Sequence, residues 1–270
     1  MPTSKRKISD LAYNANSLLL SLHEFQESLD EASTLPQANI KSGPLILIPE
    51  VKDLAEYQGS AEVEGKALSM EVLKQLIELV RRHVSVVTQA GSRVLINLIL
   101  LRVASAMSTD QMDVNIIPEY PIFRALSPNH HSFDGVVDFL LTKLPGRYTP
   151  FLLGDPTIAL SNPNAIKGPT SSTIFEAKRE NVRVAIPRAV KATASYCKQH
   201  SLQVLRGCVT SGEQWVFFVY RVAIDGGGVV SCSEEFNIGP RFEGLPLILG
   251  LLHDWVNNTM DRQQIFFTYE

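Results

Sequence analysis

The pattern of apolar and polar positions predicts two helices in the first half of the chain. From Met70 to Val84, apolar residues recur at steps of three and four, and Ser69 precedes them as a candidate N-cap. The next segment, 91–107, is apolar on most sides, so we expect a helix that lies mostly buried. Arg93 is one of its few polar residues, and a buried helix must give such a side chain a partner.

Later in the chain the pattern changes to runs of β-branched and aromatic residues, which predict strands. The first two strands are 131–143 and 171–180, and the stretch between them, 144–170, is rich in Pro, Gly and Asn and should be irregular. Helical spacing returns at 186–200, with Pro187 suited to the first turn. A strand pair joined by TSGEQ, a hairpin turn at DGGG leading into a further strand, and a closing apolar helix complete the order.

This order of helices and strands predicts an α/β fold in which helices flank a mixed β-sheet. Residues 1–66 combine a predicted helix at 8–30 with loop punctuated by Pro and Gly, and we interpret them as an N-terminal helical arm. Residues 67–270 then form the main domain. The arm is also a candidate for joining copies of the chain into a homo-oligomer.

Composition and charge narrow the class of protein and its compartment. With 270 residues, 45% of them hydrophobic, the chain can bury a full core. The formal net charge of −3 argues against a uniformly basic surface that coats nucleic acid, although a local basic face is compatible with it. The three cysteines show no zinc or disulfide spacing, and no stretch suggests a signal peptide or a membrane span. We therefore expect an intracellular protein, and the basic SKRK near the start leaves cytoplasm and nucleus both open.

One segment, TIFEAKRE at 173–180, places an acid and a lysine within an otherwise apolar strand. Residues two apart on a strand share a face, so Glu176 and Lys178 point the same way. A charge in a central strand costs several kcal/mol unless it is paired or bound to a metal. Asp138, in the apolar strand GVVDFLL, is the candidate partner, and the three side chains converge if the two strands are neighbours. A buried ion pair with a purely structural role is the alternative interpretation.

These segments, in this order, resemble the PD-(D/E)XK nuclease superfamily, and in particular its fungal-type members. The resemblance lies in a Gly-x-x-Asp-aromatic strand, GVVDF, then in Glu-Ala-Lys within TIFEAKRE and the helix after it. It continues in Gly-x-x-Thr-x-Gly-x-x-Trp-x-Phe, which is matched by GCVTSGEQWVF. The matching region extends from about Thr88 to about Tyr220. The resemblance implies a restriction-endonuclease-like fold for the main domain.

The resemblance also implies a metal-dependent nuclease that hydrolyses phosphodiester bonds, acting on DNA rather than RNA. Asp138, Glu176 and the main-chain carbonyl of Ala177 would hold Mg²⁺ or Mn²⁺, and Lys178 would orient or activate the attacking water. Carboxylate and carbonyl oxygens are the ligands that these hard cations prefer. A cation at the scissile phosphate polarises it and lowers the pKa of bound water.

Two regions depart from the superfamily pattern. Where the early helix often carries Thr/Ser-Glu-Ala-x-x-Arg, this chain has Gln89 in place of the acid, followed by Arg93. A neutral amide cannot supply the missing charge, so we assign both residues a supporting role. The helix after Glu-Ala-Lys often carries a glutamine, but the corresponding positions here include Arg188 and Lys191. These departures keep a second hypothesis open, a catalytically degenerate module of the same fold that binds nucleic acid or a protein partner.

Basic residues crowd the segment that begins at Glu-Ala-Lys. Arg179, Arg183, Arg188 and Lys191 follow in a short span that contains a single acid, Glu180. Phosphate contacts from such a stripe would hold a nucleic-acid strand in a salt-sensitive way without reading its bases. A solvated helix face is the alternative interpretation of the same charges.

Overall fold

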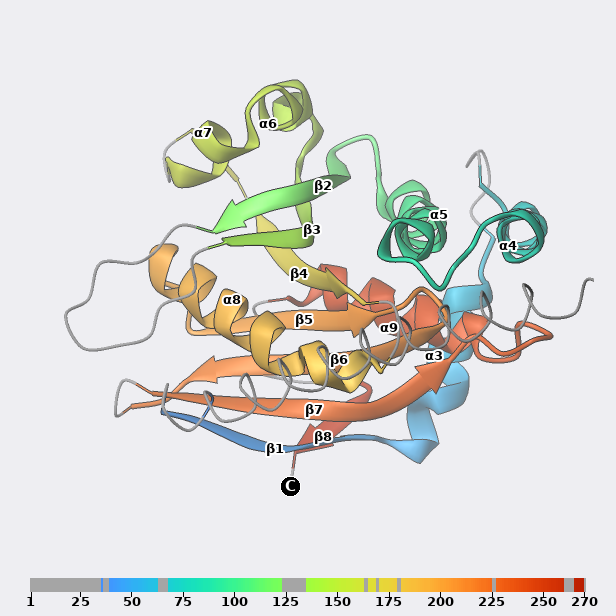
Figure 1. The fold of residues 1–270 in the computed structure, drawn as a ribbon. Helices are drawn as coiled ribbons and strands as arrows, with labels where there is room; N and C mark the ends of the chain where they lie inside the picture. Colours follow the sequence, from blue (N-terminus) through green and yellow to red (C-terminus); the bar gives the residue numbers. More distant parts are fainter. Residues whose placement is uncertain are drawn as a thin grey trace, which may run out of the picture.

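The part of the chain that can be described folds around one mixed β-sheet. The computed structural model describes Leu35 and residues 39–62, 68–122, 135–162, 165–168, 170–178, 181–224, 227–259 and 265–269. The strands within these residues are β1 (Ile40–Leu47), β2 (Met112–Ile122), β3 (Gly135–Pro145), β4 (Ser171–Ala177), β5 (Val204–Thr210), β6 (Gln214–Val222), β7 (Gly228–Asn237) and β8 (Phe267–Tyr269). They form an eight-stranded sheet in the order β2-β3-β4-β5-β6-β7-β1-β8 (Figure 1).

Helices cover both faces of this sheet. They are α3 (Lys52–Ser60), α4 (Met70–His83), α5 (Gln89–Met107), α6 (Thr149–Gly154), α7 (Pro156–Ser161), α8 (Ile186–Gln199) and α9 (Leu245–Asn257), with 3₁₀ turns at Pro49–Val51, Gly146–Tyr148 and Val182–Ala185. On one face α5 and α9 pack on the strands, with α4 beside α5 and α3 beside α9. On the other face α8 packs on β4, β5 and β6 (Figure 1). The prediction of a mixed sheet flanked by helices is therefore confirmed.

The predicted helices that lie within the described residues are confirmed, and side-chain caps explain where two of them begin. Ser69 caps α4, because its Oγ accepts a hydrogen bond from the Val72 N–H at 3.2 Å. α5 begins at Gln89, two residues before the predicted start, because Thr88 Oγ1 accepts from the Gly91 N–H at 3.0 Å. This earlier start brings the first turn of α5 to the end of the sheet where the candidate site lies.

The strand connections around the candidate site also match the prediction. β3 and β4 are antiparallel neighbours. α8, with Pro187 in its first turn, connects β4 to the parallel strand β5. β5, β6 and β7 then form consecutive antiparallel pairs, as the turns TSGEQ and DGGG predict.

Two strands do not show in the sequence pattern because prolines interrupt them. β2 contains Pro118 and Pro121, and it tolerates them because it is an edge strand of the sheet. Gly43 and Pro44 led us to predict a loop within the arm 1–66. In the structure this segment is the strand β1, which pairs with β7 and with β8. The sheet therefore takes residues from both predicted segments of the chain.

Short helices also replace predicted loop. The segment 144–170 predicts irregular structure, but it contains α6 and α7, each with a proline in its first turn. Proline is tolerated there because the first N–H groups of a helix have no intrahelical partner. α3, which falls within the predicted arm, packs against α9. The predicted helix 8–30 lies outside the described residues.

α5 is apolar enough to raise the question of a membrane. Among the described residues it is the single helix long and apolar enough to cross one by length and composition, so the expectation that no stretch reaches this length is wrong. Half of the qualifying window is buried inside the protein, as for a core helix. Its buried Arg102 donates to the carbonyls of Leu68 and Ala61 at 2.6 and 2.9 Å, which supplies the partners that a buried polar residue needs.

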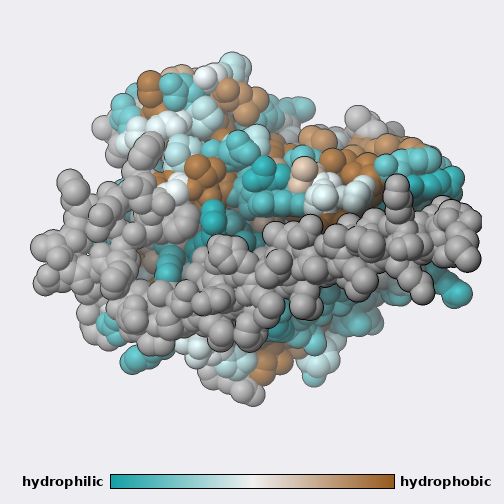
Figure 2. All heavy atoms as spheres, in the orientation of Figure 1, coloured by the Kyte–Doolittle hydropathy of each residue, from teal (hydrophilic) through white to brown (hydrophobic). Residues whose placement is uncertain are grey.

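Among the residues coloured in Figure 2, apolar side chains gather over α6 and α7 and over α5, with hydrophilic side chains between them. α6 and α7 expose Phe151, Leu153 and Ile158. These three side chains lie apart from the cavity described below, since they are not part of its lining.

Candidate active site

β4 places Glu176 in the interior of the protein. Its neighbours alternate between the two faces of the sheet, with Phe175 and Ala177 in the core under α5 and α9 and Ile174 in the core under α8. The Glu176 side chain is 2% exposed. The structure thus confirms a buried acid in a central strand.

Asp138 reaches the same place from β3. The antiparallel register pairs Phe139 with Phe175, which puts Asp138 beside the end of β4 that carries Glu176. Asp138 is also buried, and its Oδ2 accepts a hydrogen bond from the Ala177 N–H at 2.8 Å. This bond ties the carboxylate of one strand to the backbone of the next, and the predicted convergence of the two acids is confirmed.

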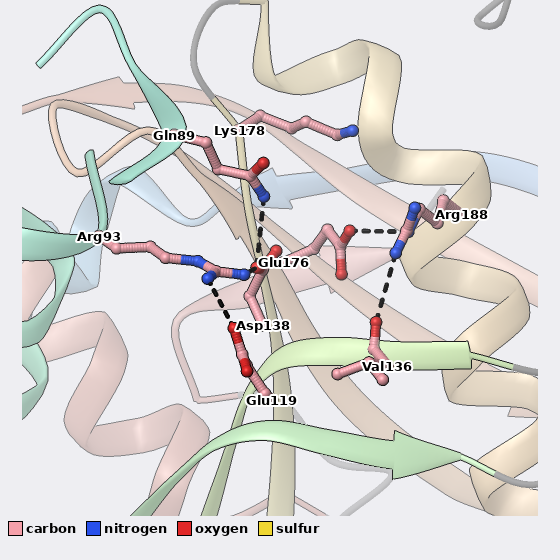
Figure 3. A pocket seen from close by; sticks show the side chains of 8 residues that line it. All are labelled: Gln89, Arg93, Glu119, Val136, Asp138, Glu176, Lys178 and Arg188. Atoms are coloured by element: carbon pink, nitrogen blue, oxygen red, sulfur yellow. Dashed lines mark hydrogen bonds and ion pairs between the residues drawn. The ribbon is translucent and has the colours of Figure 1, made fainter. Parts of the chain in front are cut away.

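Both acids and Lys178 line one cavity of about 460 Å³ (Figure 3). The lining residues come from β2, β3, α5, α8 and the end of β4, and they are Gln89, Arg93, Glu119, Val136, Asp138, Glu176, Lys178 and Arg188. Lys178 directly follows β4, and its N–H donates to the Thr210 carbonyl at 2.8 Å. This bond anchors the lysine backbone to β5, so the side chain leaves the sheet at the cavity.

Each buried acid has an arginine partner within the cavity. Nη2 of Arg93, on α5, pairs with Oδ1 of Asp138, and Nε2 of Gln89 lies 3.4 Å from the same oxygen. Arg188, in the first turn of α8, brings its Nε to 2.9 Å from Oε1 of Glu176. Both residues predicted to be supporting therefore contact Asp138, and Arg188 contacts the other acid.

Burial and charge together alter the proton affinity of Glu176. Burial, followed by repulsion from the Asp138 carboxylate, raises its pKa to about 7, and this rise is partly offset by the positive charges of Arg188 and Lys178. Glu176 Oε2 is buried and, among the described residues, has no hydrogen-bond partner. A carboxylate oxygen without a partner, on a side chain that lines a cavity, is a position that a cation or a proton can take.

Glu119 lines the cavity as well, although no sequence pattern pointed to it. It lies in β2, and its Oε1 accepts a hydrogen bond from Nη1 of Arg93 at 2.9 Å. Its backbone is left-handed, with φ of 52°, a conformation that costs a residue with a Cβ about 1 kcal/mol. The available signal was a single acid in the apolar, proline-containing stretch NIIPEYPI, which does not predict a strand.

These residues fit a hard divalent cation. Two buried carboxylates face one cavity, one of their oxygens lacks a partner, and their mutual repulsion would be relieved by a positive ion. The described residues contain no cluster of three or more His, Cys, Asp and Glu side chains that could hold a metal. The predicted ligand set has two such side chains, Asp138 and Glu176, and takes its third ligand from the Ala177 main chain.

The predicted basic stripe divides between two places. Arg188 lines the site, whereas Arg183 donates to the Ser233 carbonyl at 3.3 Å and lines a second cavity between β1 and β7. Lys191 is half-buried on α8 and is not part of the lining of the carboxylate cavity. Arg179 lies outside the described residues. Of the four residues predicted to bind nucleic acid, the structure brings Arg188 to the site.

Comparison with known proteins leaves the function to be inferred from this geometry. The sequence matches no family model and no curated protein.

Proposed function

We propose that this cavity hydrolyses phosphodiester bonds of nucleic acid, DNA rather than RNA, and that it does so on a restriction-endonuclease-like fold. The observation that carries the proposal is the convergence of Asp138, Glu176 and Lys178 on the lining of one cavity, where one buried Glu176 oxygen has no partner among the described residues. Asp138, Glu176 and the Ala177 carbonyl would hold Mg²⁺ or Mn²⁺ there. Such a cation would polarise the scissile phosphate and lower the pKa of a water molecule bound to it.

The residues of the chain would each contribute to this reaction. Lys178, two residues after Glu176 at the mouth of the cavity, can donate to a phosphate oxygen and orient the attacking water. Water oxygen forms the new bond to phosphorus and releases a proton to the solvent. The bond to the leaving sugar oxygen breaks, and that oxygen takes up a proton from the solvent. Arg188 is 40% exposed, so its guanidinium can contact the DNA backbone while it partly neutralises Glu176.

A second candidate function is nucleic-acid or protein binding without turnover. Two observations favour it: Gln89 lies beside Asp138 at the place where the superfamily pattern has an acid, and each buried carboxylate already has an arginine counterion. A cavity balanced in this way keeps its shape without a metal. Gln89→Glu would restore the missing charge, and we expect it to raise metal-dependent cleavage if catalysis is retained.

A cleavage assay tests the first proposal. Plasmid, single-stranded DNA and RNA are incubated with the protein in Mg²⁺, Mn²⁺ or EDTA, and we expect EDTA-sensitive cleavage of DNA. Lys178→Ala should lower the rate by about 100-fold or more, and Glu176→Ala should do so at least as strongly. Lys198→Ala, an exposed lysine on α8, is the matched control and should cleave normally.

Cleavage that survives both site substitutions, or that is indifferent to EDTA, would contradict the nuclease assignment. Salt-sensitive retention of DNA by the wild-type protein without any cleavage would support the binding module instead.

A further inference from the structure

We propose that Glu119 is a positioning residue of this site, which holds Arg93 at the edge of the cavity so that Asp138 can accept a divalent cation. The inference rests on the proposed function and adds a residue that neither the predicted catalytic set nor the predicted supporting set contains. Glu119 would act through Arg93 and not as a ligand of the cation.

The backbone conformation at Glu119 is unusual for a residue in a paired strand. The ladder between β2 and β3 is continuous on both sides, with Pro118 opposite Phe139 and Tyr120 opposite Val137. Between these pairs Glu119 has φ of 52°, which glycine would adopt without strain. Strain in a residue other than glycine, within a paired strand and at the lining of a cavity, is typical of functional sites.

The ion pairs show what the side chain does there. One guanidinium, that of Arg93, bridges two acids: Nη1 lies 2.9 Å from Oε1 of Glu119, and Nη2 pairs with Oδ1 of Asp138. The Glu119 side chain is 66% exposed, whereas that of Asp138 is 6% exposed. Arg93 therefore connects a solvated acid at the mouth of the cavity to a buried one in its interior.

The balance of charges in the cavity explains why the bridge from Glu119 to Asp138 through Arg93 would affect the binding of a cation. The lining contains three cationic side chains, Arg93, Lys178 and Arg188, and three acids, Glu119, Asp138 and Glu176. Without Glu119 the cations would outnumber the acids, and Arg93 would both repel a divalent cation and compete with it for Asp138. With Glu119 present, Arg93 has a second acid to pair with when Asp138 turns to the cation.

A double-mutant cycle tests this role, with Mn²⁺ affinity measured by isothermal titration calorimetry. The four proteins are wild type, Glu119→Gln, Arg93→Met and the double variant. We expect Glu119→Gln to weaken Mn²⁺ binding by about threefold to fivefold, the range for one partly exposed ion pair, and to have no measurable effect in the Arg93→Met background. Circular dichroism of each variant checks that it is folded.

Glu119→Gly separates this role from a structural one. Glycine accepts the left-handed backbone, so this variant should unfold at the wild-type temperature or above. Its affinity for Mn²⁺ should still fall by about threefold to fivefold, the effect of one ion pair. Loss of affinity with retained stability is a result that a merely structural salt bridge would not give.

Two results would overturn the positioning role while the proposed function stands. Equal weakening by Glu119→Gln in both backgrounds would make Glu119 a direct ligand, and no weakening in either would make it a surface ion pair. A wild-type protein that binds no Mn²⁺ would instead remove the proposed function, and the inference with it.

Discussion

Two arginine–acid pairs lie on opposite faces of the same sheet, and they differ in how completely they are enclosed. Under α9, Arg206 and Asp254 are 0 and 1% exposed, with Nη1 and Oδ2 2.5 Å apart, and the guanidinium lies over the ring of Trp255. Under α8, Glu176 is as deeply buried, but its partner Arg188 reaches solvent and both line a cavity.

The difference separates an ion pair sealed in the core from an ion pair that lines a cavity. Burying an ion pair is tolerable when both partners are enclosed and held by further contacts, and removing one partner then leaves the other uncompensated. Glu176 is paired with an arginine that is 40% exposed, and both side chains line a cavity. We call Glu176 and Arg188 the open pair, and Arg206 and Asp254 the closed pair. The stability contribution of the open pair should depend on pH and on added cations. That of the closed pair should change mainly when one of its residues is substituted.

The largest expected effect is on the closed pair. Asp254→Ala should lower the free energy of unfolding by about 3–5 kcal/mol, because it leaves the Arg206 guanidinium buried without its counterion. Urea unfolding measures this change. Glu56→Ala, which removes an exposed pair with Lys52, is the matched control and should cost at most about 0.5 kcal/mol. A loss for Asp254→Ala as small as that of the control would erase the distinction between the two pairs.

The next effect is a pH dependence that belongs to the open pair. Glu176 has a folded-state pKa of about 7 against a usual value of 4.5, so between these values the folded protein holds a proton that the unfolded chain has released. Its contribution to stability is therefore lost as pH rises, by an amount on the order of 3 kcal/mol above pH 7. Glu176→Gln should be more stable than wild type at pH 8 and no more stable at pH 4.

Unfolding free energies of the two proteins across this pH range provide the measurement, and their difference is the quantity to compare. A difference that stays constant between pH 4 and pH 8 would contradict the raised pKa of Glu176.

The smallest effect concerns the exposed partner of the open pair. Arg188→Gln removes a positive charge that lowers the Glu176 pKa, so this pKa should move above 7, while the stability changes by less than about 1 kcal/mol because Arg188 is partly solvated. Carbon-13 NMR of the Glu176 carboxyl follows the titration. Arg147→Gln, an exposed arginine beside Tyr148, is the control and should leave the titration unchanged. An unaltered Glu176 pKa in the Arg188 variant would mean that the pair is not electrostatically coupled.

Sequence reasoning identified the two acids because charge inside an apolar strand is rare enough to require an explanation. Asp138 and Glu176 stood out for that reason, and the order of strands around them was predictable from hydrophobic period and turn residues. Glu119 did not stand out, because Pro118 and Pro121 mask its strand. The closed pair of Arg206 and Asp254 also escaped notice, since a strand residue and a helix residue far apart in sequence share no local pattern.

The sequence by itself determined which segments become the central strands and helices and which acids enter the interior, because those choices follow from local periodicity and from the cost of burying charge. The tertiary structure alone decided which arginine meets which acid, where β1 and β2 join the sheet, and that Glu119 faces Asp138 across Arg93. These outcomes depend on contacts between residues distant in sequence, and the distances between them are fixed when strands pair and helices pack.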